Sequence, residues 1–299
     1  MKKQKISVLL QRVDTQWIFL FLVCLVSLLV APYVVVARGN CTETDRLLIG
    51  TGPYYYTDKL RQGLEPLVEY LSRELDRDVQ LIITKNYEEL ADKVEDGGID
   101  IGFFSPVLYV QLKQRYPQLK YLVTSQLTEG GKKISSHFGW IIVRKDSSIT
   151  KVKHLRGKSF AFTNKHSSSG YIYPQGYFQR RGLVSEAFFS RTIFAGTHEE
   201  VTDMIAEGEV ETGVSYDVNI WSAEEKYGRI FRRIKKVGPI LNPSFAANEH
   251  LEDALCEQII TALENVPRKV LKRDLVYTGF RRLSETSFTV VADLLKIVE

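Results

Sequence analysis

Three consecutive serines followed by a glycine form the stretch "HSSSG", in which Ser167 is the first serine and Gly170 the glycine. They come directly after an apolar run at 158–163 and open a segment that we predict to be helical from Ser168 to Arg181. The start of a helix offers unpaired N–H groups and a partial positive charge, and serine hydroxyls there can cap the helix or donate to an oxyanion. Neutral donors of this kind can hold a phosphate-like group without a lysine. The alternative is that one serine caps the helix and the other two are solvated.

Further polar side chains directly follow other predicted strands. The residues concerned are Tyr54, Tyr55, Tyr56, Ser105, Tyr109, Thr197, His198 and Asp217. Each has an ordinary structural explanation, since tyrosines fill cores, Ser105 and Asp217 can cap helices, and a lone histidine is more often structural than a ligand. In α/β sheets, however, ligands sit beyond the carboxyl ends of the strands. The shared position of these residues therefore favours one common site.

The elements that position these residues alternate between strands and helices from Arg46 onward. The predicted strands are 46–52, 78–84, 99–105, 119–125, 137–145, 158–163, 191–196 and 211–217, and the predicted helices include 87–98, 106–117, 198–208, 250–267 and 286–298. Such alternation predicts an α/β fold with largely parallel sheets. Two successive sets of four to five strands predict two lobes rather than one wide sheet.

Several classes of function are disfavoured by the sequence. The net charge of +4, with no basic stripe, gives no reason to expect a nucleic-acid partner. The sequence has no P-loop, no zinc-type spacing of His and Cys, and no nucleophile elbow, and His198 has no obvious triad partner. We therefore expect a binding protein rather than an enzyme, with no cofactor and no metal.

The first 37 residues differ in composition from the rest. Residues 1–16 carry four basic side chains and one acidic one, and residues 17–37 then run for 21 residues without a charge. About 20 apolar residues span a bilayer as a helix, and the basic flank predicts that 1–16 is cytoplasmic and that the remainder is exported. We expect a retained transmembrane signal-anchor in the cell membrane. The alternative is a signal peptide cut after Ala37, which would leave a soluble periplasmic protein.

The cysteines leave two possibilities open. In an oxidising compartment, Cys41 and Cys256 would both be exported and could form a disulfide. The simpler alternative is that both are unpaired and that Cys256 is buried on a helix.

Four stretches resemble the phosphate-, phosphite- and phosphonate-binding proteins of ABC importers, the PhnD-like branch of the type II periplasmic binding proteins. They are "LEPLVEYLSRELDRDV", "GGIDIGFFSPVLYV", "LRGKSFAFTNKHSSSGYIYP" and "GTHEEVTDMIAEGEVETGVSYD", and the similarity covers roughly 46–295. The resemblance implies a two-lobed α/β fold with a hinge and a central cleft. Lobe I would hold 46–140 with 240–299, and lobe II would hold 141–239.

The resemblance also implies which residues hold a ligand. Phosphoryl oxygens would be bound by Ser167, Ser168, Ser169 and His198, and the opposite wall would contain Tyr55, Ser105 and Tyr109. Asp217 would face a ligand substituent, where it could meet the ammonium of an aminoalkyl phosphonate or accept a hydrogen bond from a protonated oxyanion.

The function implied is that of an extracytoplasmic solute-binding protein. It would capture a phosphonate, phosphite or phosphate by closing its cleft and serve the permease and ATPase of an ABC importer. The alternative is a membrane-tethered sensing domain that works with a histidine kinase or another membrane partner. The sequence leaves open which of the three anions is the native ligand.

Overall fold

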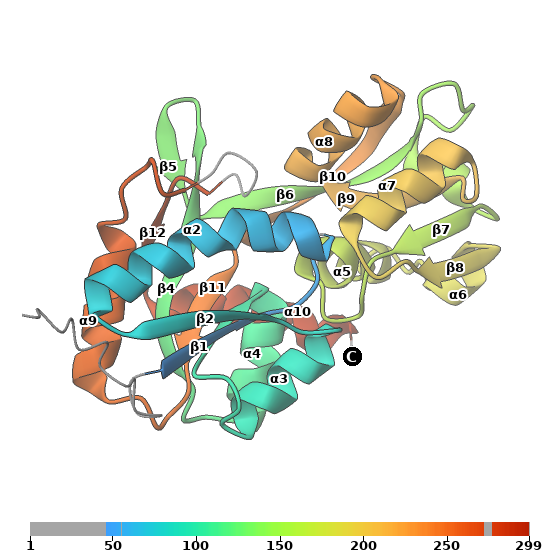
Figure 1. Cartoon of the computed structure of the whole chain (residues 1–299). Helices are drawn as coiled ribbons and strands as arrows, with labels where there is room; N and C mark the ends of the chain where they lie inside the picture. Colours follow the sequence, from blue (N-terminus) through green and yellow to red (C-terminus); the bar gives the residue numbers. More distant parts are fainter. Residues whose placement is uncertain (1–45, 55, 272–276, 299) are drawn as a thin grey trace, which may run out of the picture. The chain divides into compact units, whose positions relative to one another are not determined.

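The computed structural model describes residues 46–54, 56–271 and 277–298, which form two β-sheets flanked by helices (Figure 1). The predicted segments 1–16 and 17–37 and the candidate residues Cys41 and Tyr55 lie outside the described residues. Within the described ranges, no helix is both long and apolar enough to cross a membrane. The predicted α/β fold with two lobes is confirmed by the two sheets. The prediction of largely parallel sheets is wrong, because six of the ten strand pairings among the described residues are antiparallel.

The larger sheet is the core of lobe I. Its strands are β1 (Arg46–Thr51), β2 (Asp78–Ile83), β3 (Ile101–Phe104), β4 (Lys120–Glu129), β5 (Lys132–Ile134), β11 (Ser244–Ala247) and β12 (Gly279–Arg281). They are arranged in the order β12-β4-β11-β3-β1-β2, and β5 pairs with β4. Strands β1, β2 and β3 are parallel, so their carboxyl ends meet at one edge of the sheet.

The smaller sheet is the core of lobe II. Its strands are β6 (Ser136–Arg144), β7 (Ser159–Phe162), β8 (Arg191–Phe194), β9 (Thr212–Tyr216) and β10 (Phe231–Leu241), in the order β10-β6-β9-β7-β8. The chain passes between the sheets at 134–136 and again at 241–244. The lobe boundaries predicted at 140/141 and 239/240 therefore fall inside β6 and β10, a few residues away from the change of sheet.

Helices cover both faces of each sheet. In lobe I they are α2 (Thr57–Leu75) and α9 (Asp253–Glu264) on one face, with α3 (Tyr87–Glu95), α4 (Pro106–Arg115), η5 (Glu285–Phe288) and α10 (Thr289–Val298) on the other. In lobe II they are η2 (Val152–Leu155), η3 (Ser168–Ile172), α5 (Tyr173–Gln179) and α6 (Ser185–Phe188) on one face, with α7 (His198–Glu207) and α8 (Asp217–Tyr227) on the other.

The alternation of side chains along the strands explains why both faces are covered. Phe103 packs with the α2 and α9 layer, whereas Phe104, the next residue, is buried in the α4 layer. In lobe II, Phe160 and Ala161 likewise belong to clusters on opposite faces of the sheet. Because successive residues of a strand point to opposite faces, strands that are apolar at consecutive positions need helices on both sides.

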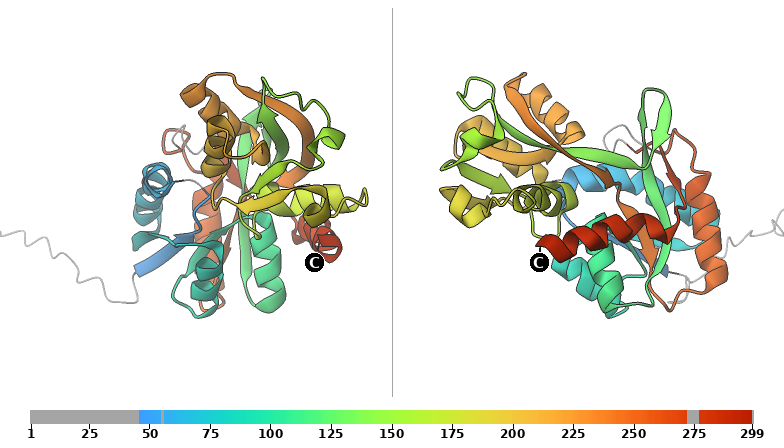
Figure 2. Two further views of the ribbon diagram at one scale, coloured as in Figure 1. Left: turned by 90° about the vertical axis from the view of Figure 1, so that its right-hand side faces the viewer. Right: turned by 180° about the vertical axis from the view of Figure 1, so that it is seen from behind.

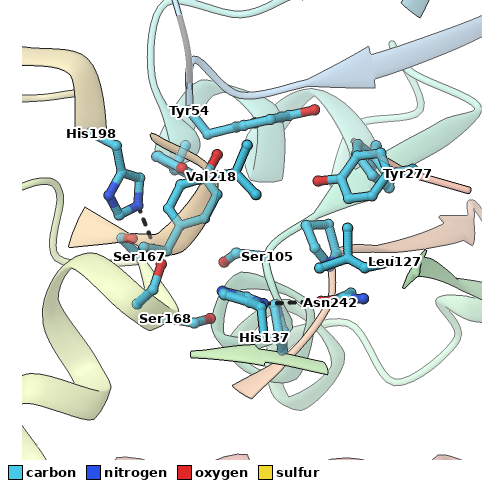
Figure 3. A pocket seen from close by; sticks show the side chains of 16 residues that line it. Tyr54, Ser105, Leu127, His137, Ser167, Ser168, His198, Val218, Asn242 and Tyr277 are labelled. Atoms are coloured by element: carbon cyan, nitrogen blue, oxygen red, sulfur yellow. Dashed lines mark hydrogen bonds between the residues drawn. The ribbon is translucent and has the colours of Figure 1, made fainter. Parts of the chain in front are cut away.

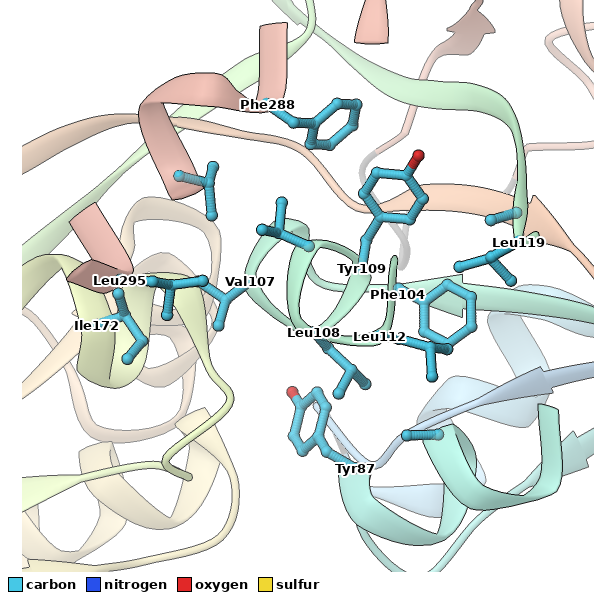
Figure 4. Close-up of a cluster of buried hydrophobic side chains, with 14 of the residues drawn as sticks. Tyr87, Phe104, Val107, Leu108, Tyr109, Leu112, Leu119, Ile172, Phe288 and Leu295 are labelled. Carbon is cyan, nitrogen blue, oxygen red and sulfur yellow. The ribbon is translucent and has the colours of Figure 1, made fainter. Parts of the chain in front are cut away.

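Helix α10 packs against both lobes. Its residues Leu294 and Leu295 belong to the same buried cluster as Val107 of α4 in lobe I and Ile172 at the end of η3 in lobe II (Figure 4). Seen from behind, α10 lies beside the region where β6 and β10 connect the lobes (Figure 2). A Cβ atom on Gly176 of α5 would lie 2.3 Å from Leu294 Cδ1, so α5 and α10 pack closely at this position.

The predicted elements differ from the structure mainly at short strands and at one helix. The predicted helix 168–181 is divided into the π-helical turn η3 and the α-helix α5, which ends at Gln179. The short strands β11 and β12 carry too few residues for a period to be recognised, and we predicted neither from the sequence.

Replacing Leu294 with alanine tests the contribution of α10. Leu294 is 5% exposed, so Leu294→Ala should lower the free energy of unfolding by about 2–5 kcal/mol through lost burial and a residual cavity. Val290, on the same helix but 54% exposed, provides the control: Val290→Ala should change that free energy by about 0.5 kcal/mol or less. Denaturant unfolding of both variants measures the difference, and equal effects would contradict the packing described.

Candidate ligand-binding site

A small cavity of about 70 Å³ lies between the two lobes and is lined by both (Figure 3). Lobe I contributes Tyr54 and Phe103 from the ends of β1 and β3, and lobe II contributes the serine turn and His198. Among the described residues that line it there is no Lys, Arg, Asp or Glu. The cavity is thus built from neutral groups only.

The serine turn follows β7 and is wider than an α-helical turn. The carbonyl of Ser167 accepts hydrogen bonds from the N–H groups of both Tyr171 (3.1 Å) and Ile172 (3.0 Å), which makes the first turn π-helical. A Cβ atom on Gly170 would lie 1.8 Å from Thr163 Oγ1, so only glycine fits where the turn passes the end of the strand. The turn therefore presents its serine hydroxyls at a fixed position beside the cavity.

The hydroxyls of Ser167 and Ser168 each keep a proton to donate. Ser167 Oγ accepts from the N–H of Gly170 at 3.0 Å. Ser168 Oγ accepts from the N–H of Val107, at the start of α4 in lobe I, at 3.1 Å. A hydroxyl has one proton, and accepting a hydrogen bond does not use it, so both serines can donate to a ligand.

His198 orients the third hydroxyl through a buried chain of hydrogen bonds. Asn219 Nδ2 donates to Ser215 Oγ at 2.9 Å, and Ser215 Oγ lies 3.3 Å from His198 Nδ1. Burial, together with the nearby His137, lowers the pKa of His198 to about 3, so the ring is neutral at pH 7. We infer that Ser215, which accepts a hydrogen bond from Asn219, donates its own proton to Nδ1; in this tautomer Nε2–H donates to Ser169 Oγ at 3.2 Å and leaves the proton of Ser169 for a ligand.

Ser105 lines the cavity as predicted, but its proton is already used. Its hydroxyl donates to the carbonyl of His166 in lobe II at 2.9 Å and accepts from the N–H of Leu108 at 3.2 Å. Ser105 therefore caps α4 and joins the two lobes, and it has no hydroxyl proton left for a ligand.

Two predicted site residues do not line the cavity, and a third is not described. Tyr109 is 2% exposed and packs in the core beside α10, where its hydroxyl donates to Glu285 at 3.2 Å (Figure 4). The Asp217 carboxylate lies 3.7 Å from Arg233 Nε, and its neighbour Tyr216 lines the cavity instead. Tyr55 lies outside the described residues, whereas Tyr54 lines the cavity.

Several lining residues were not predicted from the sequence, including four that belong to β4, to β6 and to the segments before β11 and β12. His137 is the second residue of β6 and Asn242 lies between β10 and β11, both beside the change of sheet, whereas Leu127 belongs to β4 and Tyr277 lies just before β12. None of them follows a parallel strand. The nearest signal in the sequence was the position of the predicted lobe boundaries, at 140/141 and 239/240, which could have directed attention to His137 and Asn242.

Contacts between the lobes close the cavity on two sides. On one side, Lys59 Nζ lies 3.1 Å from Glu199 Oε1, and the N–H of Tyr56 donates to the same carboxylate at 2.6 Å. On the other, His166 lies 3.2 Å from Glu88 and 2.7 Å from Gln111. The structure therefore represents a form in which the lobes are in contact around the cavity.

Two lobes around a small cavity lined by neutral groups are the arrangement of a solute-binding protein. The family described as the periplasmic substrate-binding proteins of phosphonate ABC transporters matches residues 49–288, and the chain belongs to this family. The resemblance to this family found in the sequence is thereby confirmed.

Individual relatives are more distant. The phosphate-import protein PhnD of Mycolicibacterium smegmatis is 27% identical over 225 residues, which are 72% of this chain and 68% of that protein. The tetrathionate sensor histidine kinase TtrS of Salmonella typhimurium is 25% identical over 69% of this chain but only 37% of its own length. The structure of PhnD1 from Prochlorococcus marinus in complex with methylphosphonate superposes with a TM-score of 0.75 at 16% identity, covering 84% of this chain and 97% of that one.

Replacing Ser168 with alanine tests the serine turn. Ser168→Ala removes a hydroxyl that can donate to a ligand and leaves the buried N–H of Val107 unpaired, so ligand binding should weaken by about 1–3 kcal/mol. Ser185, a buried serine of lobe II whose hydroxyl donates to Gln175 away from the cavity, is the matched control. Calorimetric titration should find unchanged affinity for Ser185→Ala. An unchanged dissociation constant for Ser168→Ala would mean that the serine is only structural.

Proposed function

We propose that this protein captures a phosphorus oxyanion, namely a phosphonate, phosphite or phosphate, in the cavity between its lobes and delivers it to an ABC importer. The observation that carries the proposal is the serine turn, in which Ser167, Ser168 and Ser169 each retain a proton to donate into the cavity. Three convergent neutral donors suit the oxygens of a tetrahedral anion. Hydrogen bonds to a charged acceptor contribute about 1.5–3 kcal/mol each.

The absence of a cation among the described lining residues favours a singly charged form of the ligand. A buried charge that is not paired with an opposite charge must be stabilised by hydrogen bonds alone, and the cost of burial rises steeply with the charge. His198 does not contribute a positive charge, because its pKa is lowered to about 3. We infer that the bound anion carries one negative charge.

The size and walls of the cavity restrict the substituent on phosphorus. A volume of about 70 Å³ accommodates roughly five to seven water-sized groups at about 10–15 Å³ each. The wall of lobe I includes Phe103, Leu127 and Tyr277, which suit a hydrogen atom, a hydroxyl or a methyl group. Because Asp217 does not line the cavity, an ammonium group has no carboxylate partner there among the described residues. An aminoalkyl phosphonate is therefore the least suitable of the candidates.

A sensing role is less well supported than import. The sensor kinase TtrS aligns with this chain over little more than a third of its own length, whereas the phosphate-import protein aligns over two thirds. The name of that kinase refers to a sulfur oxyanion, so sulfur oxyanions belong in any ligand screen. Binding of a phosphorus oxyanion by the lobes agrees with the importer family.

A calorimetric screen of the ligand-free protein tests the proposal. Methylphosphonate, phosphite and phosphate should bind, and aminoethylphosphonate should bind at least about tenfold more weakly, since its ammonium would be buried without a partner. All four of these compounds contain a phosphorus oxyanion. If none of them binds, the proposed function is wrong.

We further propose that residues 17–37 anchor the protein in the membrane, which their 21 uncharged residues favour. The full-length chain should then sediment with membranes and remain there after a high-salt wash, because an apolar helix is not released by screening charges. A form lacking residues 1–37 should stay in the soluble fraction. Recovery of a soluble product that begins after Ala37 would instead show that the segment is a cleaved signal peptide.

A further inference from the structure

The side chain of Asn242 fixes which nitrogen of His137 carries a proton. Asn242 Nδ2 donates to two backbone carbonyls, those of Ser125 at 2.9 Å and Ile134 at 3.3 Å. Both amide protons are therefore used, and the amide oxygen faces His137 Nδ1 at 3.0 Å. An oxygen can only accept, so Nδ1 of His137 must be the nitrogen that carries the proton.

The other nitrogen of His137, Nε2, is consequently an acceptor that faces the cavity. Enclosure lowers the pKa of His137 to about 4, so the ring is neutral at pH 7 and Nε2 has a lone pair. His137 lines the cavity, and in Figure 3 its second nitrogen points away from Asn242. No hydrogen bond to Nε2 is present among the described residues.

The charged and titratable groups around His137 leave its ring neutral. Asp217 at the start of α8 raises the pKa of His137 slightly against the larger effect of enclosure. His198 of α7 is itself neutral, and the Tyr216 ring of β9 lies edge-on with its centroid 5.6 Å from that of His137. From lobe I, Tyr54 and Tyr277 bring neutral phenol groups, which can donate as well as accept, to the same cavity.

We propose that His137 Nε2 accepts a hydrogen bond from a protonated oxygen of the bound anion and thereby selects phosphorus oxyanions over sulfur oxyanions. The inference rests on the proposed function, because it concerns the same cavity. A singly charged phosphonate has one P–O–H group, which donates to Nε2 while its other oxygens accept from the serine turn. A sulfonate of the same size and charge has no O–H, so one of its oxygens would face the lone pair of Nε2 and repel it.

The proposed hydrogen bond fixes how many protons the complex contains. One proton is shared between Nε2 and the facing oxygen, whether it is assigned to the anion or to the ring. Above the second pKa of the ligand, binding must take up one proton from solution, so the affinity should fall about tenfold for each further pH unit.

The test compares methylphosphonate with methanesulfonate at a pH at least one unit below the second pKa of methylphosphonate. Both are then monoanions of similar size that differ in a single O–H group. A site built around that group should prefer methylphosphonate roughly 100-fold or more. In the full-length His137→Phe variant, which lacks the acceptor, the preference should fall below about tenfold.

His154, an exposed histidine of η2 that lies outside the cavity, provides the matched control. His154→Phe should retain the full preference for methylphosphonate. If the His137→Phe variant does not fold, nitrogen NMR of the wild-type histidine rings replaces it. Methylphosphonate, and not methanesulfonate, should then shift the Nε2 signal of His137 toward its protonated range.

The outcomes separate the two proposals. If the wild-type protein binds no phosphorus oxyanion, the proposed function is wrong. If it binds methylphosphonate and methanesulfonate equally, or if His137→Phe keeps the full preference, the function stands and the role of His137 is overturned.

Discussion

The structure of the site depends on how hydrogen-bond protons are distributed in a cavity whose described lining residues include no Lys or Arg. An anion enclosed there must be stabilised by donors alone, and every donor that is used within the protein is lost to the ligand. Backbone N–H groups donate to Ser167 and Ser168, so these two serines keep their own hydroxyl protons for a ligand. In the same way, the neutral ring of His198 donates from Nε2–H to Ser169 and leaves the hydroxyl proton of Ser169 available.

The same distribution of hydrogen-bond protons links ligand binding to lobe closure. The N–H that donates to Ser168 belongs to Val107 of the other lobe, so this donor reaches Ser168 only when the lobes are together. Ser105 makes the reciprocal contact by donating to the carbonyl of His166. An anion that accepts from Ser168 therefore interacts best with the closed form, which is the differential contact that ligand-driven closure requires.

Much of this arrangement could be predicted from the sequence. The alternation of strands and helices indicated the α/β layers, and the serine turn and His198 lie beside the cavity because they follow strands β7 and β8. Asp217 and Tyr109 show the limit of such reasoning. Both follow predicted strands, where ligand-binding residues are expected. The direction of a side chain, however, depends on its tertiary partners, which are Arg233 for Asp217 and Glu285 for Tyr109. A pattern of residue types contains no information about these partners.

The residues that the sequence did not reveal come from segments without a periodic pattern. His137 and Asn242 lie where the chain passes between the sheets, and their hydrogen bond exists only because two crossings, far apart in sequence, run side by side. The role of an acceptor for a protonated oxyanion, which the sequence suggested for Asp217, is available to His137. The chemistry could thus be anticipated more reliably than the residue that supplies it.

Helix α10 contacts both lobes, and this position makes it a useful place for an optical label. A fluorophore attached at the exposed Val290 would sit beside the joint between the lobes and outside the ligand cavity. Its surroundings would change as the lobes separate, while the serine turn would remain unmodified. The helix could therefore convert occupancy of the cavity into a fluorescence signal, which would allow the protein to serve as a reagentless sensor for its ligand.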